Sequence, residues 1–275
     1  MITEVAPAKV NLVLQVGPRR GDGLHDICSI FASLELADEL TFEPAERDEV
    51  ICRGVPGPNL VSRALDAFRS EVPDLMPLRV TIQKSIPVAA GLGGGSADAA
   101  AALRAANEIA GRPLEAGGLR RLGARVGADV PSQVEPRHAL VTGAGEGVEP
   151  IELPEMTIVL VPAEEGLSTA AVYAEADRLP STRPHLDPDA LRRLARAPLA
   201  AFARGLENDL EPAALSLRPE LTGTLEDLRE AGALAANITG SGPTAFGVYE
   251  SWAEADAGSA LLSDAIVTPL RNSPR

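Results

Sequence analysis

The chain has 275 residues with 45% hydrophobic content, enough for one large domain or two ordinary domains with buried cores. Its formal net charge of −14 argues against non-specific binding to nucleic acid or to an anionic membrane, so an anionic substrate needs a local positive site. The two cysteines lack metal-ligand spacing, the N-terminus lacks a signal-peptide pattern, and no apolar run is long enough to span a membrane. We therefore expect a cytoplasmic protein with reduced thiols, with no nucleic-acid or membrane partner, as a monomer or homodimer.

Residues 1–17 are predicted to be extended. Apolar residues such as Val10 and Leu12 alternate with polar ones, and this period of two places Lys9 and Asn11 on the same face. An ammonium and an amide two residues apart are suited to an anionic or hydroxyl-bearing ligand. They fit a solvated outer face equally well, and the spacing alone leaves both interpretations open.

A turn with two arginines leads to His25, and we predict a strand over residues 27–36 and further short strands over 38–53. A lone histidine is more often structural than functional, so His25 carries little weight by its position alone. Asn59 is a plausible N-cap for a helix that follows it, because its side-chain oxygen can accept a hydrogen bond from the first turn.

Four glycines fall within five positions of the stretch 87–98, Pro-Val-Ala-Ala-Gly-Leu-Gly-Gly-Gly-Ser-Ala-Asp. The alternating residues 78–84 before it predict a strand, and the alanine-rich residues after it predict a helix with Ser96 at or near the N-cap. Bare backbone N–H groups and a helix N-terminus are suited to an anion, so we expect a phosphate site here. The alternative is a tight turn that uses glycine only for its backbone freedom.

This glycine stretch does not follow either of the two common phosphate-binding patterns. A P-loop requires lysine after its last glycine, whereas Gly95 is followed by Ser96. The dinucleotide pattern Gly-x-Gly-x-x-Gly fails as well, because its sixth position is Ser96 or Asp98. We therefore expect a phosphate loop of a third kind.

A helix is predicted over residues 115–126, and Asp129 follows it in the sequence Gly-Ala-Asp-Val-Pro. Pro131 disfavours helical backbone at Val130, so we expect Asp129 at a junction between a helix and a strand. A carboxylate that only stabilises its own turn is the simpler interpretation of this residue. Residues 143–147 contain three glycines and predict a hairpin or loop.

After residue 150 the pattern restarts, which predicts a first domain over 1–150 and a second over 151–275. The second part contains a strand at 157–161, a helix at 168–177 that carries Tyr173, and several helical segments. Strands at 234–238 and 244–249, a helix at 252–262 and a strand at 265–270 complete it. This order is typical of a ferredoxin-like unit.

Three segments together resemble the motifs of the GHMP kinases, ATP-dependent kinases of small molecules such as galactose, homoserine and mevalonate. The segments are Ala-Pro-Ala-Lys-Val-Asn-Leu at 6–12, the glycine stretch at 87–96, and Ile-Thr-Gly-Ser-Gly-Pro at 238–243, in the order of the family's motifs. The resemblance implies an α+β fold with two domains. The N-terminal domain would resemble domain 2 of ribosomal protein S5, and the C-terminal domain would be ferredoxin-like.

The resemblance also implies roles for individual residues. Asp129 would be the catalytic base, with Lys9 as its partner. The residues that would wrap the phosphates of ATP are Pro87, Val88, Ala89, Ala90, Gly91, Leu92, Gly93, Gly94, Gly95, Ser96 and Ala97. Asn59 and Lys84 would approach the adenosine. Mg²⁺ would accompany ATP, with Ser96 as the protein residue beside it unless its hydroxyl caps the helix.

Within the family, the sequences Pro-Ala-Lys-Val-Asn-Leu, Arg-x-Gly-Asp-Gly-x-His and Gly-Ala-Asp-Val-Pro resemble members that phosphorylate the C2 hydroxyl of a diphosphocytidyl methylerythritol. That reaction belongs to the non-mevalonate route to isoprenoids. The resemblance implies that His25 and Tyr173 sandwich the cytosine and that Asn11 and Thr169 contact the substrate. A kinase for mevalonate-type or homoserine-type substrates, or a non-catalytic nucleotide-binding protein, is the alternative.

Several positions depart from the pattern of those members. Leu24 stands where tyrosine is usual, Ser132 and Gln133 replace apolar residues, and Ala97 replaces a second serine. Tyr173 stands in for phenylalanine. Leu24 has neither the ring nor the hydroxyl of tyrosine, so one of the expected contacts with the substrate is missing. Lys9, Asp129 and the glycine stretch are all present.

Overall fold

The computed structural model describes residues 1–55, 59–163, 165–179 and 181–271. The chain forms two compact units: Met1–Ala8, Leu36–Val88 and Gly93–Arg137 make the first, and Lys9–Glu35, Ala89–Leu92 and His138–Arg275 make the second. The chain passes between the units inside strands β1 (Ile2–Arg19) and β2 (His25–Pro44). The last passage lies between Arg137 and His138, before the boundary predicted at residue 150.

The first unit contains a sheet in which β4 (Leu78–Gln83) lies between β3 (Glu49–Cys52) and the second half of β2. The β3–β4 pair is parallel, whereas β2 and β4 are antiparallel. The alternation predicted for β4 is confirmed, because its apolar side chains are buried and the polar ones between them are not. The prediction of separate short strands over 38–53 is wrong in part, since β2 continues to Pro44 where it pairs with β4.

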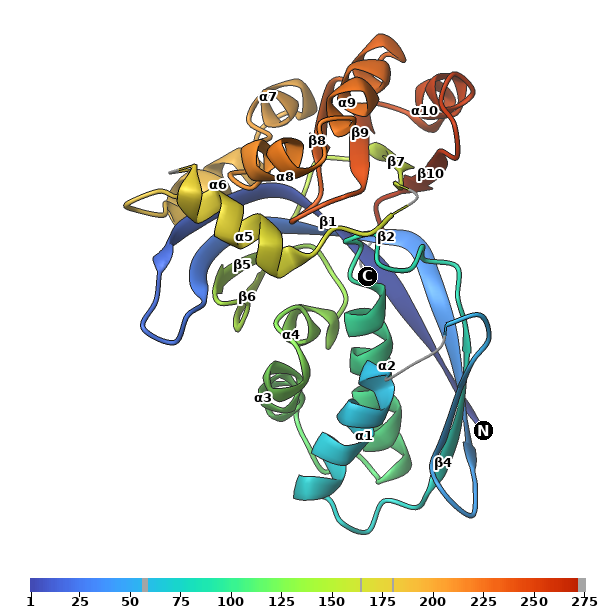
Figure 1. The fold of residues 1–275 in the computed structure, drawn as a ribbon. Helices are drawn as coiled ribbons and strands as arrows, with labels where there is room; N and C mark the ends of the chain where they lie inside the picture. Colours follow the sequence, from blue (N-terminus) through green and yellow to red (C-terminus); the bar gives the residue numbers. More distant parts are fainter. Residues whose placement is uncertain (56–58, 164, 180, 272–275) are drawn as a thin grey trace. The chain divides into compact units, whose positions relative to one another are not determined.

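The described residues of the first unit also form the helices α1 (Leu60–Glu71), α2 (Gly94–Ile109), α3 (Ala116–Val126) and the short α4 (Val130–Gln133). Asn59 caps α1 as predicted, because its Oδ1 accepts a hydrogen bond of 2.8 Å from the N–H of Val61. Residues 99–102 of α2 are consecutive, fully buried alanines, so neighbouring elements can approach this helix closely on several sides. Figure 1 shows α1 running beside it.

Two local predictions in this unit are wrong. Helix α2 begins at Gly94 with Gly93 as its N-cap, so Ser96 lies within the first turn and does not cap the helix. Val130 is helical, not extended, because Pro131 occupies the first turn of α4, where its missing N–H has no intrahelical partner to lose. Asp129 therefore lies between two helices.

In the second unit, β5 (Ala139–Gly143) pairs antiparallel with the first half of β2, and with β6 (Gly147–Pro150). The β5–β6 connection confirms the hairpin predicted at residues 143–147. Gly143 has a φ of 69°, a left-handed conformation that glycine adopts without strain.

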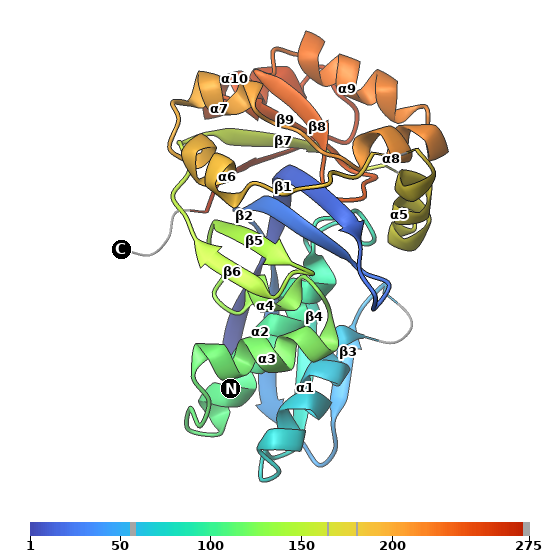
Figure 2. The same cartoon turned by 90° about the vertical axis from the view of Figure 1, so that its left-hand side faces the viewer.

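The second unit also contains a four-stranded sheet, with β7 (Thr157–Val161) and β9 (Ala245–Tyr249) in its centre. The edge strands are β10 (Ile266–Pro269) and β8 (Ala235–Ile238), and every pair is antiparallel. Helices α9 (Leu221–Glu230) and α10 (Trp252–Ser259) cover the same face (Figure 2). This strand–helix–strand–strand–helix–strand arrangement confirms the predicted ferredoxin-like unit.

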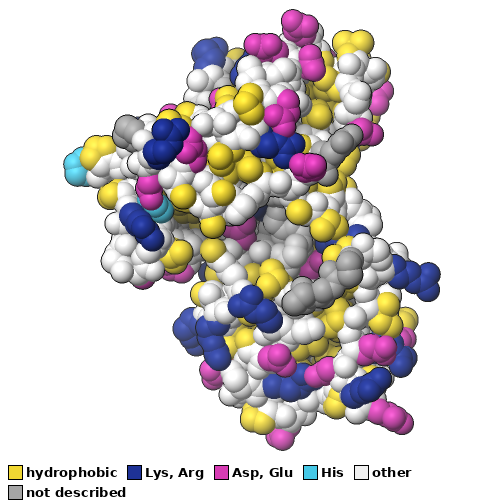
Figure 3. All heavy atoms as spheres, viewed as in Figure 1, with side chains coloured by type: hydrophobic (Ala, Val, Ile, Leu, Met, Phe, Trp, Pro, Cys, Tyr) yellow, Lys and Arg dark blue, Asp and Glu magenta, His cyan; other side chains and the backbone are white. Residues whose placement is uncertain are grey.

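Four further helices lie between β7 and α9: α5 (Thr169–Arg178), α6 (Pro188–Ala195), α7 (Leu199–Arg204) and α8 (Glu211–Leu217). The sequence did not predict α7, which is too short to show a helical period. Acidic and basic side chains are intermixed on the face drawn in Figure 3. Across the part of the chain that the structure describes, we find no helix with the length and apolar character needed to span a membrane.

Candidate active site

Lys9 is held by the glycine stretch in the second unit. Its Nζ donates hydrogen bonds to Asn11 Oδ1 at 2.7 Å and to the carbonyl of Gly91 at 3.2 Å, while its backbone N–H donates to the carbonyl of Leu92 at 3.0 Å. Lys9 and Asn11 share a face of β1 as predicted, and both are at most 5% exposed. The interpretation of this pair as a solvated outer face is therefore wrong.

The amide of Asn11 has a defined orientation. Its Nδ2 donates to Ser29 Oγ at 3.0 Å, and that hydroxyl donates in turn to the carbonyl of Val13 at 2.5 Å. Its Oδ1 is consequently the atom that faces the ammonium of Lys9, which also lies 5.1 Å from the ring centre of Phe31. The polar face of β1 is thus a fixed arrangement of donors and acceptors.

The third glycine-containing motif, residues 239–243, packs on the same place. The backbone N–H of Asn11 donates to Thr239 Oγ1 at 2.9 Å. Gly91 has a φ of 78°, and a Cβ atom there would lie only 2.7 Å from the carbonyl oxygen of Gly242. Only glycine fits at residue 91, so the three motifs meet through close backbone contacts in one unit.

Asn208 holds this third motif, and sequence reasoning missed it. Its Nδ2 donates to the carbonyls of Ile238 and Gly240, both at 2.8 Å, and its Oδ1 accepts from the N–H of Leu210 at 2.9 Å. The side chain is buried. A single asparagine between two predicted helices gives no signal of such a role in the sequence.

His25 and Tyr173 are neighbours, as the sandwich prediction requires, with ring centres 5.2 Å apart and ring planes tilted by 33°. His25 Nδ1 lies 2.9 Å from the carbonyl of Gly17, which places the proton on that nitrogen, and Nε2 lies 3.4 Å from Asp177 Oδ1. A base stacked between two rings needs them about 7 Å apart, twice the van der Waals separation. The rings must therefore separate further before they can enclose cytosine.

Thr169, which is predicted to contact the substrate, and Leu24, which stands where tyrosine is usual, also lie in this unit. Thr169, the first residue of α5, is exposed, and its hydroxyl lies 2.9 Å from the hydroxyl of Ser241 in the third motif. Leu24 is 54% exposed in the turn before His25, so the chain presents an aliphatic surface at the position where tyrosine is usual.

The first unit holds the remaining phosphate-loop residues, and α2 begins among them. Gly93, with a φ of 71°, is the N-cap and makes no side-chain capping hydrogen bond. The first N–H groups of a helix have no intrahelical acceptor, and here the residues that carry them are Gly94, Gly95 and Ser96. A helix start with small side chains and no capping side chain is well suited to bind an anion.

Lys84 lies just before the glycine stretch and is bound by two carboxylates. Its Nζ is 2.5 Å from Asp38 Oδ2 and 2.9 Å from Asp98 Oδ2. Burial raises the pKa of the Asp98 carboxyl to about 7, although the nearby Lys84 ammonium acts in the opposite direction. Sequence reasoning gave no role to either carboxylate, although Asp98 is the last residue of the glycine stretch 87–98.

Asp129 is half-buried between α3 and α4. Its carbonyl oxygen accepts a hydrogen bond of 2.8 Å from Ser132 Oγ, while its carboxylate makes no capping bond to α4. The carboxylate therefore does not act as the N-cap of α4. Asp129 belongs to the first unit and Lys9 to the second, and their pairing stays a prediction.

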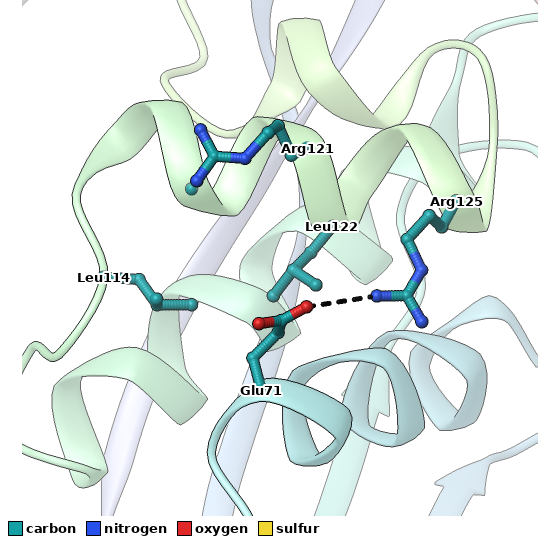
Figure 4. A pocket seen from close by; sticks show the side chains of 6 residues that line it. Glu71, Leu114, Arg121, Leu122 and Arg125 are labelled. Atoms are coloured by element: carbon teal, nitrogen blue, oxygen red, sulfur yellow. Dashed lines mark ion pairs between the residues drawn. The ribbon is translucent and has the colours of Figure 1, made fainter.

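The first unit contains a surface pocket of about 250 Å³, and no predicted site residue is among the residues that line it (Figure 4). It is lined by Glu71, Leu114, Gly118, Arg121, Leu122 and Arg125, and Arg125 forms an ion pair of 3.6 Å with Glu71. We assign no function to this pocket. In the described ranges, no cluster of three or more His, Cys, Asp or Glu side chains is arranged to hold a metal ion.

Comparison with known proteins decides the family. The model of the GHMP kinases N terminal domain matches residues 59–135, and the model of the GHMP kinases C terminal domain matches residues 189–263. The chain belongs to the GHMP kinase family. The two matched segments lie on either side of residue 150, although the division of this GHMP kinase into domains at that residue stays a prediction.

Relatives of this GHMP kinase carry a more specific name. A 4-diphosphocytidyl-2-C-methyl-D-erythritol kinase of Streptomyces avermitilis is 40% identical over 99% of this chain and 96% of its own length. The one of Nocardia farcinica is 43% identical over 94% of this chain and 87% of its own. A crystal structure of 4-(cytidine 5'-diphospho)-2C-methyl-D-erythritol kinase superposes with a TM-score of 0.82 and 33% identity, covering 98% of this chain and all of that one.

Proposed function

We propose that this GHMP kinase transfers the γ-phosphoryl group of ATP to the C2 hydroxyl of 4-diphosphocytidyl-2-C-methyl-D-erythritol, a step of the non-mevalonate route to isoprenoids. The names of its relatives support this substrate. The structural observation that carries the proposal is the glycine-rich start of α2, which follows an N-cap without a capping side chain. The partners are then small molecules, and we propose a cytoplasmic monomer or homodimer.

The phosphates of ATP would lie along residues 87–97. The N–H groups at the start of α2 would bind phosphate oxygens, and the positive end of the helix dipole would favour their charge. Because these dipoles are fixed before the substrate binds, they need little reorganisation during the reaction. Asn59 and Lys84 would lie toward the adenosine, as the family resemblance implies.

Mg²⁺ is expected to arrive with ATP. We propose that phosphate oxygens and water hold most of its coordination positions, because Mg²⁺ dehydrates reluctantly and usually keeps several waters. Ser96, half-buried in the first turn of α2, is the residue that we propose beside the ion. When bound, Mg²⁺ would neutralise charge on the phosphates.

Asp129 would accept the proton of the C2 hydroxyl, and Lys9 would stabilise the ionised carboxylate and the charge that develops on the transferred group. General-base assistance typically contributes about 10²–10⁴-fold to the rate. The contacts of Lys9 with Asn11 and Gly91 support this role, because they fix the ammonium against the glycine stretch.

The cytidyl group would be bound in the second unit between His25 and Tyr173, after the rings have moved apart. Asn11 and Thr169 would contact the rest of the substrate. Thr169 is exposed and hydrogen-bonded to the third motif, so its hydroxyl is close to the place where the three motifs meet.

The direct test measures ADP release with ATP, Mg²⁺ and 4-diphosphocytidyl-2-C-methyl-D-erythritol. We expect turnover with this substrate and none with 2-C-methyl-D-erythritol, which lacks the cytidine head group. Mevalonate and homoserine are the matched alternatives within the family. Turnover of either at a higher kcat/KM than the cytidyl substrate would refute the proposed specificity and leave the kinase assignment intact.

A further inference from the structure

Lysine is rare in this chain, and both lysines lie at the glycine stretch. Of the 25 basic residues, 23 are arginine, and the two lysines are Lys9 and Lys84. Lys9 contacts the carbonyl of Gly91. Lys84 Nζ lies 3.3 Å from the position that a Cβ atom would take at Gly94. A compact ammonium with three donors fits such a place, whereas a planar guanidinium needs more room.

Two buried carboxylates share the Lys84 ammonium. The side chains of Asp38 and Asp98 are 0% and 3% exposed, and that of Lys84 is 16% exposed. Oδ1 of Asp98 is buried and has no hydrogen-bond partner in the described part of the chain. Burying two carboxyl groups beside one ammonium opposes folding, so stability alone is a poor explanation for this cluster.

Asp38 also fixes the backbone that enters the glycine stretch. Its Oδ1 accepts hydrogen bonds from the N–H groups of Ser85 at 2.7 Å and Ile86 at 2.9 Å. Ile86 is buried, and its Cγ2 lies 3.1 Å from the Cβ position of Gly94. One carboxylate of β2 thereby holds both the ammonium of Lys84 and the two peptide groups that follow it.

Asp98 links the first turns of α2 to Lys84. It lies in α2, one turn after the residues whose N–H groups open the helix, and its Oδ2 accepts from Lys84 at 2.9 Å. A cation near a helix N-terminus is unfavourable by itself, and the two carboxylates offset that cost. The start of α2 is therefore tied to the end of β4 through Lys84.

We propose that Asp38, Lys84 and Asp98 form a clamp, here called the loop clamp, which sets the separation between the two ends of the phosphate loop and so positions it for ATP. Asp38 and Asp98 are then positioning residues for the nucleotide. This inference rests on the proposed function, because the loop must bind the phosphates of ATP for the clamp to matter.

Asp38→Asn tests the loop clamp. The amide keeps an oxygen for the N–H groups of Ser85 and Ile86 but places an NH₂ group against the ammonium of Lys84. We expect the KM for ATP to rise about tenfold, while the KM for the cytidyl substrate changes less than twofold. Asp66→Asn, which alters an exposed carboxylate on α1 in the same unit, serves as the matched control and should change neither constant.

Calorimetric titration with ADP separates positioning from a merely structural role. A loss of folded protein lowers the binding stoichiometry and the apparent kcat but leaves the Kd for ADP unchanged. A displaced loop raises the Kd about tenfold at full stoichiometry. An unchanged Kd for ADP in Asp38→Asn overturns the loop clamp, whatever happens to the amount of folded protein.

Asp98→Asn provides a second variant if Asp38→Asn does not fold. The asparagine retains one oxygen for Lys84 and loses the charge, so we expect a rise of about threefold in the Kd for ADP; no change would overturn the loop clamp.

The assay of the wild-type protein distinguishes a failure of the loop clamp from a failure of the proposed function. If the wild type binds ADP but does not phosphorylate the cytidyl substrate, the proposed function fails. A higher Kd for ADP in either variant than in the wild type would still support the loop clamp.

Discussion

The two lysines of the chain contact different parts of the structure within their own units. Lys9 donates to the amide oxygen of Asn11 and the backbone carbonyl of Gly91, whereas Lys84 donates to the carboxylates of Asp38 and Asp98. The contacts of Lys9 tie it to the glycine stretch and to β1, whereas the contacts of Lys84 tie the end of β4 to β2 and α2. We therefore expect substitutions at Lys9 to change the chemical step, and substitutions at Lys84 to change the fold and the phosphate loop.

The largest effect is expected where the proposed chemistry occurs. We predict that Asp129→Asn and Lys9→Met each lower kcat by about 10³-fold, because loss of a general base or of charge stabilisation in the transition state has effects of this order. Single-turnover kinetics would measure the loss, and the Kd for ADP should stay within threefold of the wild type. A kcat within tenfold of the wild type in either variant contradicts the assigned roles.

Lys84→Met is expected to act on stability. It leaves the carboxylates of Asp38 and Asp98 buried without a counter-ion, and breaking a buried ion pair in this way typically costs about 3–5 kcal/mol. Urea unfolding monitored by circular dichroism would measure the change. The matched comparison is Lys9→Met, which removes the other lysine; we expect a smaller loss there, and equal losses would remove the contrast between the two lysines.

The same contrast explains what the sequence could predict. Lys9, Asn11 and Gly91 all belong to the three motif segments, so a motif search finds both the lysine and its acceptors. Lys84 is next to a motif, but Asp38 lies 46 residues away on β2, and only strand pairing brings the two together. Nothing in the sequence around Asp38 marks its carboxylate as a partner of a distant ammonium.

Regular elements were predicted better than their ends. The ferredoxin-like order followed from clear periodicity, whereas the start of α2 was misplaced, because serine is a common N-cap and Gly93 performs that function instead. Pro131 predicted an extended Val130, but proline is also tolerated in a first helical turn, and that is where Pro131 lies. Asn208 lay outside every pattern, although it holds the third motif through two hydrogen bonds.

Tyr173→Ala tests the predicted cytosine site, which lies in the same unit as Lys9. Loss of base stacking is worth about 1–3 kcal/mol, so we predict that the Kd for the cytidyl substrate rises by about 5–150-fold. The Kd for ADP should change less than twofold, since the loop clamp in the other unit is untouched. Calorimetry with each ligand would measure both values, and equal changes would contradict a role of Tyr173 in cytosine binding.

Asn208→Ala tests whether the contacts of the third motif position Lys9 indirectly. It leaves the carbonyls of Ile238 and Gly240 without this donor, and we predict a fall in kcat of about tenfold, equivalent to the roughly 1–2 kcal/mol of a lost buried hydrogen bond. Asn237→Ala is the control, since Asn237 is also buried and its Oδ1 accepts a hydrogen bond from the N–H of its neighbour Ile238. A similar kcat in the two variants would indicate that Asn208 supports the fold and does not position Lys9.

The smallest expected effect is on the reactivity of the two cysteines. Cys28 is in the unit that contains Lys9, and Cys52 lies near Lys84, so each thiol can report on the surroundings of one lysine. Burial raises the pKa of the Cys28 thiol to about 11, and it raises that of the half-buried Cys52 while Lys84 lowers it. At pH 8 we expect iodoacetamide to alkylate Cys52 at least tenfold faster than Cys28, because only the thiolate reacts.

Substituting each lysine in turn then shows which one controls the alkylation rate of Cys52. Lys84→Met removes the positive charge that lowers the pKa of Cys52, so less thiolate is present and alkylation of Cys52 should slow by a few-fold. Lys9→Met should leave this rate unchanged. Mass spectrometry of the modified peptides under native conditions would measure both rates, and an equal response of Cys52 to the two substitutions would show that Lys84 does not control its surroundings.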